Sequence, residues 1–216
     1  MAIEKENNEI AELLLSNENI NVNHPNDSTY KKTPLCTAIE KRNSKIINLL
    51  LSNKNIDINL PDKFYPQNES SYSMNLRVKT PLCYAIESKN QVVTQLLLSN
   101  KNIDINFPCI ESKNGDELFK KTPLCIAIEN RNDQLAEFLL SNENINVNYP
   151  NDDDSDIITP LCAAIKKDNI KIIKLLLSNK NIDVNRSSLI CPKHSSGYQT
   201  SPLLLAIERE NIEIIK

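Results

Sequence analysis

A repeated 27-residue unit constrains the fold of this chain more than any other feature. The unit reads [TS]-P-L-C-x-A-I-x-x-x-N and ends L-L-S-N-x-N-I-[DN]-[IV]-N; full copies occupy residues 33–59, 80–106, 122–148 and 159–185. Self-similarity of this kind is typical of a solenoid, in which each unit buries its apolar face against its neighbours. We therefore predict one array over residues 1–216 rather than separate globular domains.

Partial copies of the unit stand at both ends of the chain, at 1–23 and 201–216. The first lacks its Thr-Pro start, and the last stops before the three leucines of the second helix. Complete arrays usually carry terminal repeats with polar outer faces. We therefore expect this array to be a segment of a longer one.

Each unit predicts two short helices. In the first full copy, Thr33 suits an N-cap and Pro34 suits the first helical position, and the apolar residues that follow have helical spacing. Five apolar residues in six follow at 46–51, too many for one helix face, so this second helix should be buried on two sides. After it, asparagine stands where a helix end favours a left-handed residue, and we expect that conformation at Asn53, Asn100, Asn142 and Asn179.

Cysteine recurs at one place in the unit, at Cys36, Cys83, Cys125 and Cys162. Stacked helices lie about 8–10 Å apart, whereas the Cα atoms of a disulfide lie within about 7 Å of each other. We therefore predict a row of buried free thiols, as in a reducing compartment. Cys109 and Cys191 lie in loops, and the sequence indicates no partner for either.

The order TPL-x-x-A-x-x-x-x-N, I-x-x-L-L-L and D-[IV]-N resembles the ankyrin repeat. The resemblance covers the chain apart from the linkers and implies an all-α ankyrin-repeat solenoid, with helix–turn–helix units and extended hairpin or loop fingers. The chain departs from the family where Cys replaces the usual His after TPL. It also departs where the usual glycine before the inter-helix turn is replaced by Arg42, Lys89, Arg131, Asp168 and Glu210.

The linkers between units vary while the units do not, with lengths of 9, 20, 15, 10 and 15 residues. Long loops in a compact array are usually functional or disordered, and these are rich in Phe and Tyr, as interface hot spots are. We predict a partner-binding surface that includes Phe64, Tyr65, Tyr72, Phe107, Phe119 and Tyr149. For any single ring, the alternative is that it covers the array's own apolar surface.

In the ankyrin family, partners usually bind the concave face formed by the fingers and the first helices. By position, the resemblance places on that face Glu40, Lys41, Glu87, Ser88, Glu129, Asn130, Lys166 and Lys167. Their charges are mixed in sign, so they indicate no partner charge, and a plain solvated helix face is the alternative for each.

No pattern indicates catalysis, a cofactor or a metal. The two histidines lie in loops, the two glycines could not build most nucleotide-binding loops, and the acidic run at 152–156 lacks the Gly and Glu of a calcium loop. A net charge of −3 argues against nucleic acid and anionic membranes as main partners. No apolar stretch has the length of a signal peptide or a membrane span, so we expect a cytoplasmic protein.

The leading hypothesis is a non-enzymatic scaffold that binds a protein of unknown identity. The chief alternative is the recognition or regulatory arm of a larger enzyme, such as a kinase or a ubiquitin-ligase adaptor, whose catalytic part lies outside this segment. A purely structural spacer is the third possibility.

Overall fold

The structure is a computed structural model, and it describes residues 7–26, 30–64, 77–113, 117–153, 156–190 and 197–209. The chain divides into two compact units. Unit 1 is Met1–Asp104 with Cys109–Glu117, and unit 2 is Ile105–Pro108 with Leu118–Lys216. Each unit is described by itself, and the single array and its repeat boundaries stay predictions.

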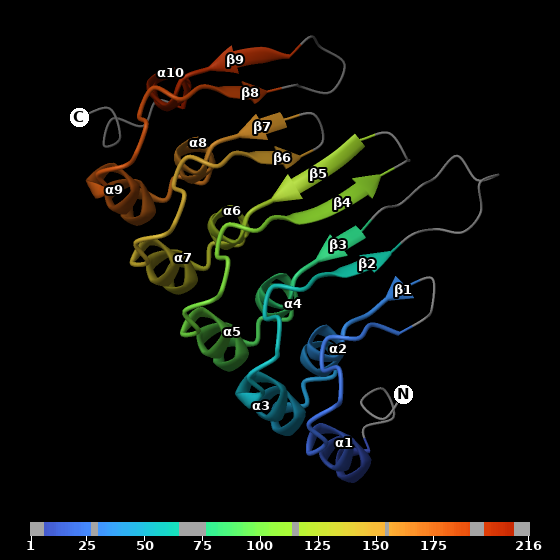
Figure 1. Cartoon of the computed structure of the whole chain (residues 1–216). Coiled ribbons are helices and arrows are strands. Elements are labelled where there is room, and N and C mark those ends of the chain that lie inside the picture. The colour runs from blue at the N-terminus through green and yellow to red at the C-terminus, as the bar shows by residue number, and fades with distance from the viewer. Residues whose placement is uncertain are drawn as a thin grey trace, which may run out of the picture. The chain divides into compact units, whose positions relative to one another are not determined.

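In unit 1, helices alternate along the chain with short antiparallel strands (Figure 1). Its helices are α1 (Asn8–Leu15), α2 (Pro34–Glu40), α3 (Ser44–Ser52), α4 (Pro81–Glu87) and α5 (Gln91–Leu98). Its strands pair in chain order, and they are β1 (Tyr30–Lys31), β2 (Asp62–Phe64), β3 (Arg77–Lys79) and β4 (Cys109–Lys113).

Unit 2 repeats this arrangement. Its helices are α6 (Pro123–Glu129), α7 (Asp133–Leu140), α8 (Pro160–Lys166), α9 (Ile170–Ser178) and α10 (Pro202–Glu208). Its strands also pair in chain order, and they are β5 (Glu117–Lys121, all but Glu117 in this unit), β6 (Asn151–Asp153), β7 (Asp156–Ile158), β8 (Ser188–Ile190) and β9 (Tyr198–Thr200). The prediction of helix pairs with fingers therefore agrees with the structure, but the label all-α leaves out the strands.

The helices begin where the repeat places its polar capping residues. The Thr33 hydroxyl accepts a hydrogen bond from the Cys36 N–H at 3.2 Å, and Pro34 opens α2, as predicted. The second helix of each pair is capped by the asparagine that ends the first half of the unit. In α3, the Ile46 N–H donates to the Asn43 side chain at 3.2 Å.

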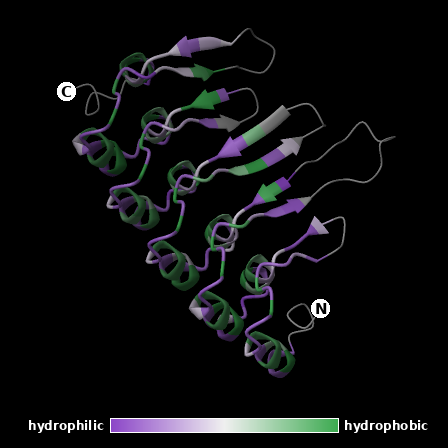
Figure 2. Ribbon diagram, in the orientation of Figure 1, coloured by the Kyte–Doolittle hydropathy of each residue, from purple (hydrophilic) through white to green (hydrophobic). Residues whose placement is uncertain are grey.

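The core of each unit lies between its helices, whose apolar faces contrast with polar loops (Figure 2). In unit 1, Ile46, Ile47 and Leu50 are fully buried on α3, which contacts both α1 and α2. The two-sided burial predicted for the second helix is therefore confirmed. In unit 2, Leu139 and Leu176 are buried in the same way on α7 and α9.

The left-handed residues lie in the inter-helix turns. Arg42, Lys89, Arg131 and Asp168, which replace the family's glycine, have φ between 50° and 55°. A side chain at left-handed φ costs free energy, and three of these residues use theirs to reach the next repeat. The Asp168 carboxylate accepts from the Arg209 guanidinium at 2.6 Å. The Arg42 guanidinium donates to the Ser88 carbonyl at 3.2 Å, and that of Arg131 donates to the Lys167 carbonyl at 2.7 Å.

The prediction that asparagine ends the second helix in a left-handed conformation is wrong. Asn53 and Asn179 are extended, with φ of −75° and −77°. The Asn53 side chain instead accepts a hydrogen bond from the Asn55 N–H at 2.9 Å, and the same turn recurs at Asn100, Asn142 and Asn179. This local bond stabilises the turn without a positive φ.

In four repeats, the last asparagine is bonded to the following repeat. The Asn59 amide donates to the Asn102 carbonyl at 2.7 Å and accepts from the Asp104 N–H at 2.8 Å. Asn23, Asn106 and Asn148 make the same pair of bonds within their own units. These bonds connect neighbouring repeats within each unit.

Candidate functional site

The antiparallel register of unit 1 brings four residues from four strands into one row. Tyr30 pairs with Phe64, Phe64 with Arg77, and Arg77 with Glu111. We call Tyr30, Phe64, Arg77 and Glu111 the finger row. Side chains alternate between the two faces of a strand, so Tyr30, Arg77 and Glu111 share one face of the fingers, and Phe64 belongs to the row by its backbone register.

Charged groups connect the finger row to helix α4. Lys79 has a side chain only 3 % exposed, and its Nζ atom lies 2.5 Å from Glu87 and 3.0 Å from Glu111. Arg77 Nε donates to Glu111 at 3.0 Å. Burial alone would raise the pKa of Glu111, but its bonds to Lys79 and Arg77 lower the pKa below the usual value. Glu111 is therefore held as a carboxylate between two cations.

Two tyrosines lie beside these charges. The Tyr84 hydroxyl, from α4, lies 3.4 Å from the Tyr30 hydroxyl, and Lys79 Nζ lies 6.0 Å from the centre of the Tyr84 ring. Burial, and then the bond to Tyr30, raise the pKa of Tyr84, so this phenol stays neutral. The face of unit 1 that carries the finger row and Tyr84, which we call its inner face, thus presents Tyr30, Tyr84 and Arg77 beside the ion pairs of Lys79 and Glu111.

The predicted charges on the first helices are mostly paired within the protein. Glu40 pairs with Lys32 at 2.5 Å and Glu129 with Lys121 at 3.1 Å, so a finger lysine meets a helix glutamate here as at Lys79 and Glu87. Lys166 pairs with Asp156 at 3.4 Å. These ion pairs tie each finger to the helix that follows it.

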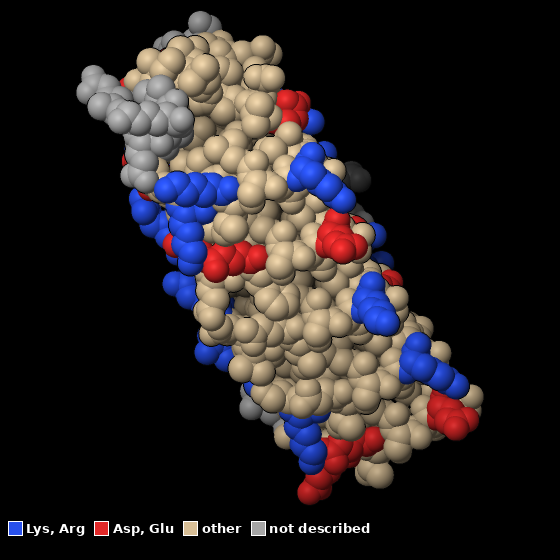
Figure 3. All heavy atoms as spheres, turned by 90° about the vertical axis from the view of Figure 1, so that its left-hand side faces the viewer, with Lys and Arg blue, Asp and Glu red and all other residues tan. Residues whose placement is uncertain are grey.

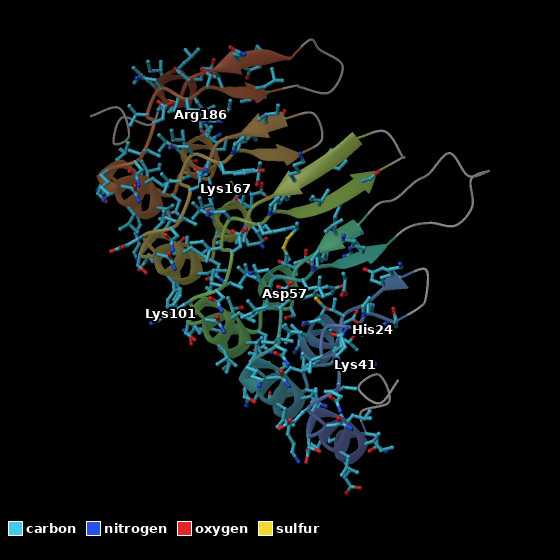
Figure 4. The ribbon with its side chains drawn as sticks, viewed as in Figure 1. His24, Lys41, Asp57, Lys101, Lys167 and Arg186 are labelled. Atoms are coloured by element: carbon cyan, nitrogen blue, oxygen red, sulfur yellow. A yellow bond between two sulfur atoms is a disulfide. The ribbon has the colours of Figure 1, made fainter. Side chains whose placement is uncertain are left out.

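The other predicted helix residues lie at the ends of the first helices. Lys41 and Asn130 are exposed, whereas Ser88 and Lys167 are half-buried and accept hydrogen bonds at their carbonyls. Figure 4 labels Lys41 at the end of α2 and Lys167 at the end of α8. No described interaction distinguishes these four residues as a site.

The predicted aromatic residues lie in different environments. Phe107 and Tyr149 are half-buried, and Phe119 is only 6 % exposed, so its ring covers the protein's own interior. Phe64 belongs to the finger row by its backbone register. Tyr65 and Tyr72 lie outside the described residues.

The prediction that Cys83 and Cys109 are unpaired is wrong. The two form a disulfide in unit 1, with their Cα atoms 6.1 Å apart, visible as a yellow bond in Figure 4. The distance between stacked helices excluded bonds within the row of cysteines but not a bond to the finger that returns over α4. Cys36, Cys125 and Cys162 are free and buried, and Cys191 lies outside the described residues.

Each finger meets the first helix of the preceding repeat at one buried position. In three repeats this position is Asp62, Asn151 or Ser188, whose side-chain oxygen accepts the backbone N–H of Thr33, Thr122 or Thr159 at 2.7, 3.0 and 3.1 Å. In the fourth it is Cys109. We call these four residues the finger bases.

Among the residues that the structure describes, no three His, Cys, Asp or Glu side chains converge as metal ligands. Within the same part of the chain, no helix combines the length and the apolar character that crossing a bilayer requires. On the face shown in Figure 3, charges of both signs, some of them side by side, lie in a mainly uncharged surface.

A family model described as ankyrin repeats in three copies matches residues 1–62 and 109–188, which is more than half of the chain. The chain belongs to the ankyrin repeat family. Ankyrin repeat domains are in general non-catalytic modules that bind other proteins. No curated protein matches this chain.

Solved ankyrin repeat structures share the fold. A domain from Acinetobacter baumannii is 20 % identical, with a TM-score of 0.62 over 100 % of this chain and 92 % of its own. The ankyrin repeat domain of Bcl-3, described as a unique member of the IkappaB protein family, is 19 % identical. Its TM-score is 0.53 over 85 % of this chain and 69 % of its own. Identities this low support the ankyrin fold alone.

Proposed function

We propose that this ankyrin protein is a non-enzymatic scaffold that binds a protein partner through the inner face of its fingers and first helices. The observation that carries the proposal is the meeting of Tyr30, Arg77 and Tyr84 on that face of unit 1. Tyrosine and arginine are the residues most enriched in interface hot spots. Arg77 is bonded to Glu111 at 3.0 Å, and the Tyr30 and Tyr84 hydroxyls lie 3.4 Å apart; such fixed side chains lose less entropy when a partner binds.

The fingers and the first helices contribute differently to this surface. The predicted helix charges, such as Glu40 and Glu129, are already paired with finger lysines. They therefore offer a partner little unpaired charge. Arg77 is paired as well, with Glu111, but it belongs to the finger row beside Tyr30, and its side chain is 44 % exposed. We place the centre of binding on the finger row and on Tyr84, with Lys41 and Asn130 at the periphery.

The proposed location is the cytoplasm. The free cysteines Cys36, Cys125 and Cys162 are buried, and burial raises the pKa of Cys36 and raises that of Cys125 to about 12. Protonated, enclosed thiols are chemically inert. A row of structural thiols is typical of a reducing compartment.

An affinity pull-down with the full chain tests the proposed function. Arg77→Ala and Tyr84→Phe remove one hot-spot group each, and Gln95→Ala, on the outer helix α5, is the matched control. We expect at least one protein to be bound by wild type and Gln95→Ala and to be depleted about tenfold with Arg77→Ala. If every captured protein binds Arg77→Ala as well as wild type, the finger row is not the binding surface.

A further inference from the structure

We propose that the Cys83–Cys109 bond is a thiol–disulfide switch that fixes finger 107–121 to helix α4 and thereby sets the state of the finger row. Its effect on a partner rests on the proposed function, but the switch itself does not. Cys83 lies on α4, Cys109 begins β4, and both are buried, at 0 % and 4 % exposure.

The bond takes the place of a hydrogen bond that the other repeats make. Asp62, Asn151 and Ser188 each present an oxygen to the N–H of a capping threonine. Cys109 presents sulfur, which is only a weak acceptor. Finger 107–121 is therefore anchored covalently when oxidised, and on reduction its base has no oxygen to replace the bond.

The arrangement is specific to this one repeat. In the equivalent repeats the finger base is Asp62, Asn151 or Ser188, and the described residues give Cys36, Cys125 and Cys162 no thiol partner. Repeat 159–185 is a natural reference state, because it combines a free Cys162 with Ser188. That pair shows that the same cysteine fits beside a hydrogen-bonding finger base.

Strand β4 transmits the state of the bond to the finger row. Two residues beyond Cys109, Glu111 bonds both Arg77 and Lys79. When β4 is released, Glu111 loses its fixed position between these two cations. In the oxidised protein, Glu111 therefore holds Arg77 and Lys79 in fixed positions. In the reduced protein, these two cations lose the fixed carboxylate between them.

The redox step requires a thiol or disulfide co-reactant of the glutathione class. Reduction breaks the S–S bond, adds two electrons and two protons to give the Cys83 and Cys109 thiols, and converts two glutathione thiols to one glutathione disulfide. Oxidation reverses this exchange. In a reducing compartment, disulfides are usually transient and redox-sensing, as the proposed location requires of this one.

Hydrogen–deuterium exchange of the full chain, in glutathione disulfide and then in dithiothreitol, tests the switch without a partner. We expect amides in 109–113 to exchange at least tenfold faster after reduction, while 151–153 and 188–190 are unchanged. Cys109→Ser copies the Cys162–Ser188 arrangement, so its exchange in 109–113 should be the same in both buffers. Equal exchange of wild type in both buffers overturns the proposal, as does a dithiothreitol response that persists in Cys109→Ser.

The pull-down, repeated in both buffers, separates the two proposals. A redox-dependent exchange rate with no partner sensitive to Arg77→Ala would leave the switch standing and refute the proposed function. A partner sensitive to Arg77→Ala with no exchange response would do the reverse. If both hold, partner capture should differ at least threefold between the buffers for wild type and not for Cys109→Ser.

Discussion

Fingers 60–79 and 107–121 are anchored at the same buried position of the repeat, but by different chemistry. Asp62 accepts both the N–H and the hydroxyl of Thr33, at 2.7 and 3.1 Å. Cys109 is bonded covalently to the helix itself. Asn151 and Ser188 anchor their fingers by hydrogen bonds in unit 2. The backbone of the repeat thus fixes where a finger is held, while the side chain decides how strongly and under what conditions.

Substitutions in the helix core should lower the free energy of unfolding more than any change at the finger bases. Leu97→Ala removes a fully buried side chain from α5 and should lower the free energy of unfolding by about 2–5 kcal/mol. Leu96→Ala, at the neighbouring position with 37 % exposure, is the control and should cost clearly less. Urea unfolding of both variants measures this, and the reverse ranking would mean that core and surface have been exchanged.

Loss of the covalent anchor should come next. In oxidising buffer, Cys109→Ala should destabilise the protein by about 3 kcal/mol, because a disulfide of this loop length restricts the unfolded chain by roughly that amount. Cys109→Ser supplies an oxygen and should recover part of the loss. In dithiothreitol the difference between wild type and Cys109→Ala should nearly vanish. If the difference persists there, the disulfide is not its cause.

Asn151→Ala tests a hydrogen-bonded anchor. Asn151 is 1 % exposed, accepts from the Thr122 N–H and donates to Glu129 at 2.8 Å. Its loss leaves buried groups unpaired, at a cost of about 2 kcal/mol. Asn130→Ala, on the exposed end of the same repeat's first helix, should change stability by less than about 0.5 kcal/mol. Equal effects of the two variants on thermal unfolding would show that the finger base does not stabilise the fold.

Asp62→Asn should have the smallest effect and the opposite sign. Burial raises the pKa of Asp62, and its Oδ2 atom has no hydrogen-bond partner among the described residues. A carboxyl whose folded pKa exceeds its unfolded value stabilises the fold most at low pH, and that stability is lost as pH rises through the folded pKa. Asparagine copies Asn151 and could donate to Glu40 as Asn151 does to Glu129.

Wild type should therefore lose stability relative to Asp62→Asn as pH rises from 4 to 7, with the variant more stable at pH 7 by about 1 kcal/mol. Urea unfolding across this range gives the difference directly. A constant difference between the two proteins at all pH values would show that Asp62 does not titrate as its burial requires.

The sequence predicts the helix pairs well because their determinants are local. Thr33 and Pro34 cap the first helix, and the apolar run at 46–51 requires burial on two sides, as the structure shows. The asparagines after the second helix do not reveal their conformation, because Asn53 stabilises its turn through its side chain rather than through a left-handed backbone. The positive φ lies instead at Arg42 and its equivalents.

The candidate site depends on strand register, which the repeat does not encode. Nothing in the linker sequences indicates that Tyr30, Phe64, Arg77 and Glu111 pair across four strands. The sequence does not single out Tyr84, because it lies on a helix, although it occupies a position where the repeats differ, with Thr37, Ile126 and Ala163 as its equivalents. A signal for the disulfide was present as well, since Cys109 aligns with Asp62, Asn151 and Ser188.

A hydrogen-exchange footprint of the full chain with a partner that wild type and Gln95→Ala both capture tests the central claim most directly. The partner is expected to slow amide exchange in β3, β4 and α4 of unit 1, where the finger row and Tyr84 lie, and to leave the outer helices α3 and α5 unchanged. Protection confined to α3 and α5, with β3 and β4 exchanging as in the free protein, would contradict binding through the finger row.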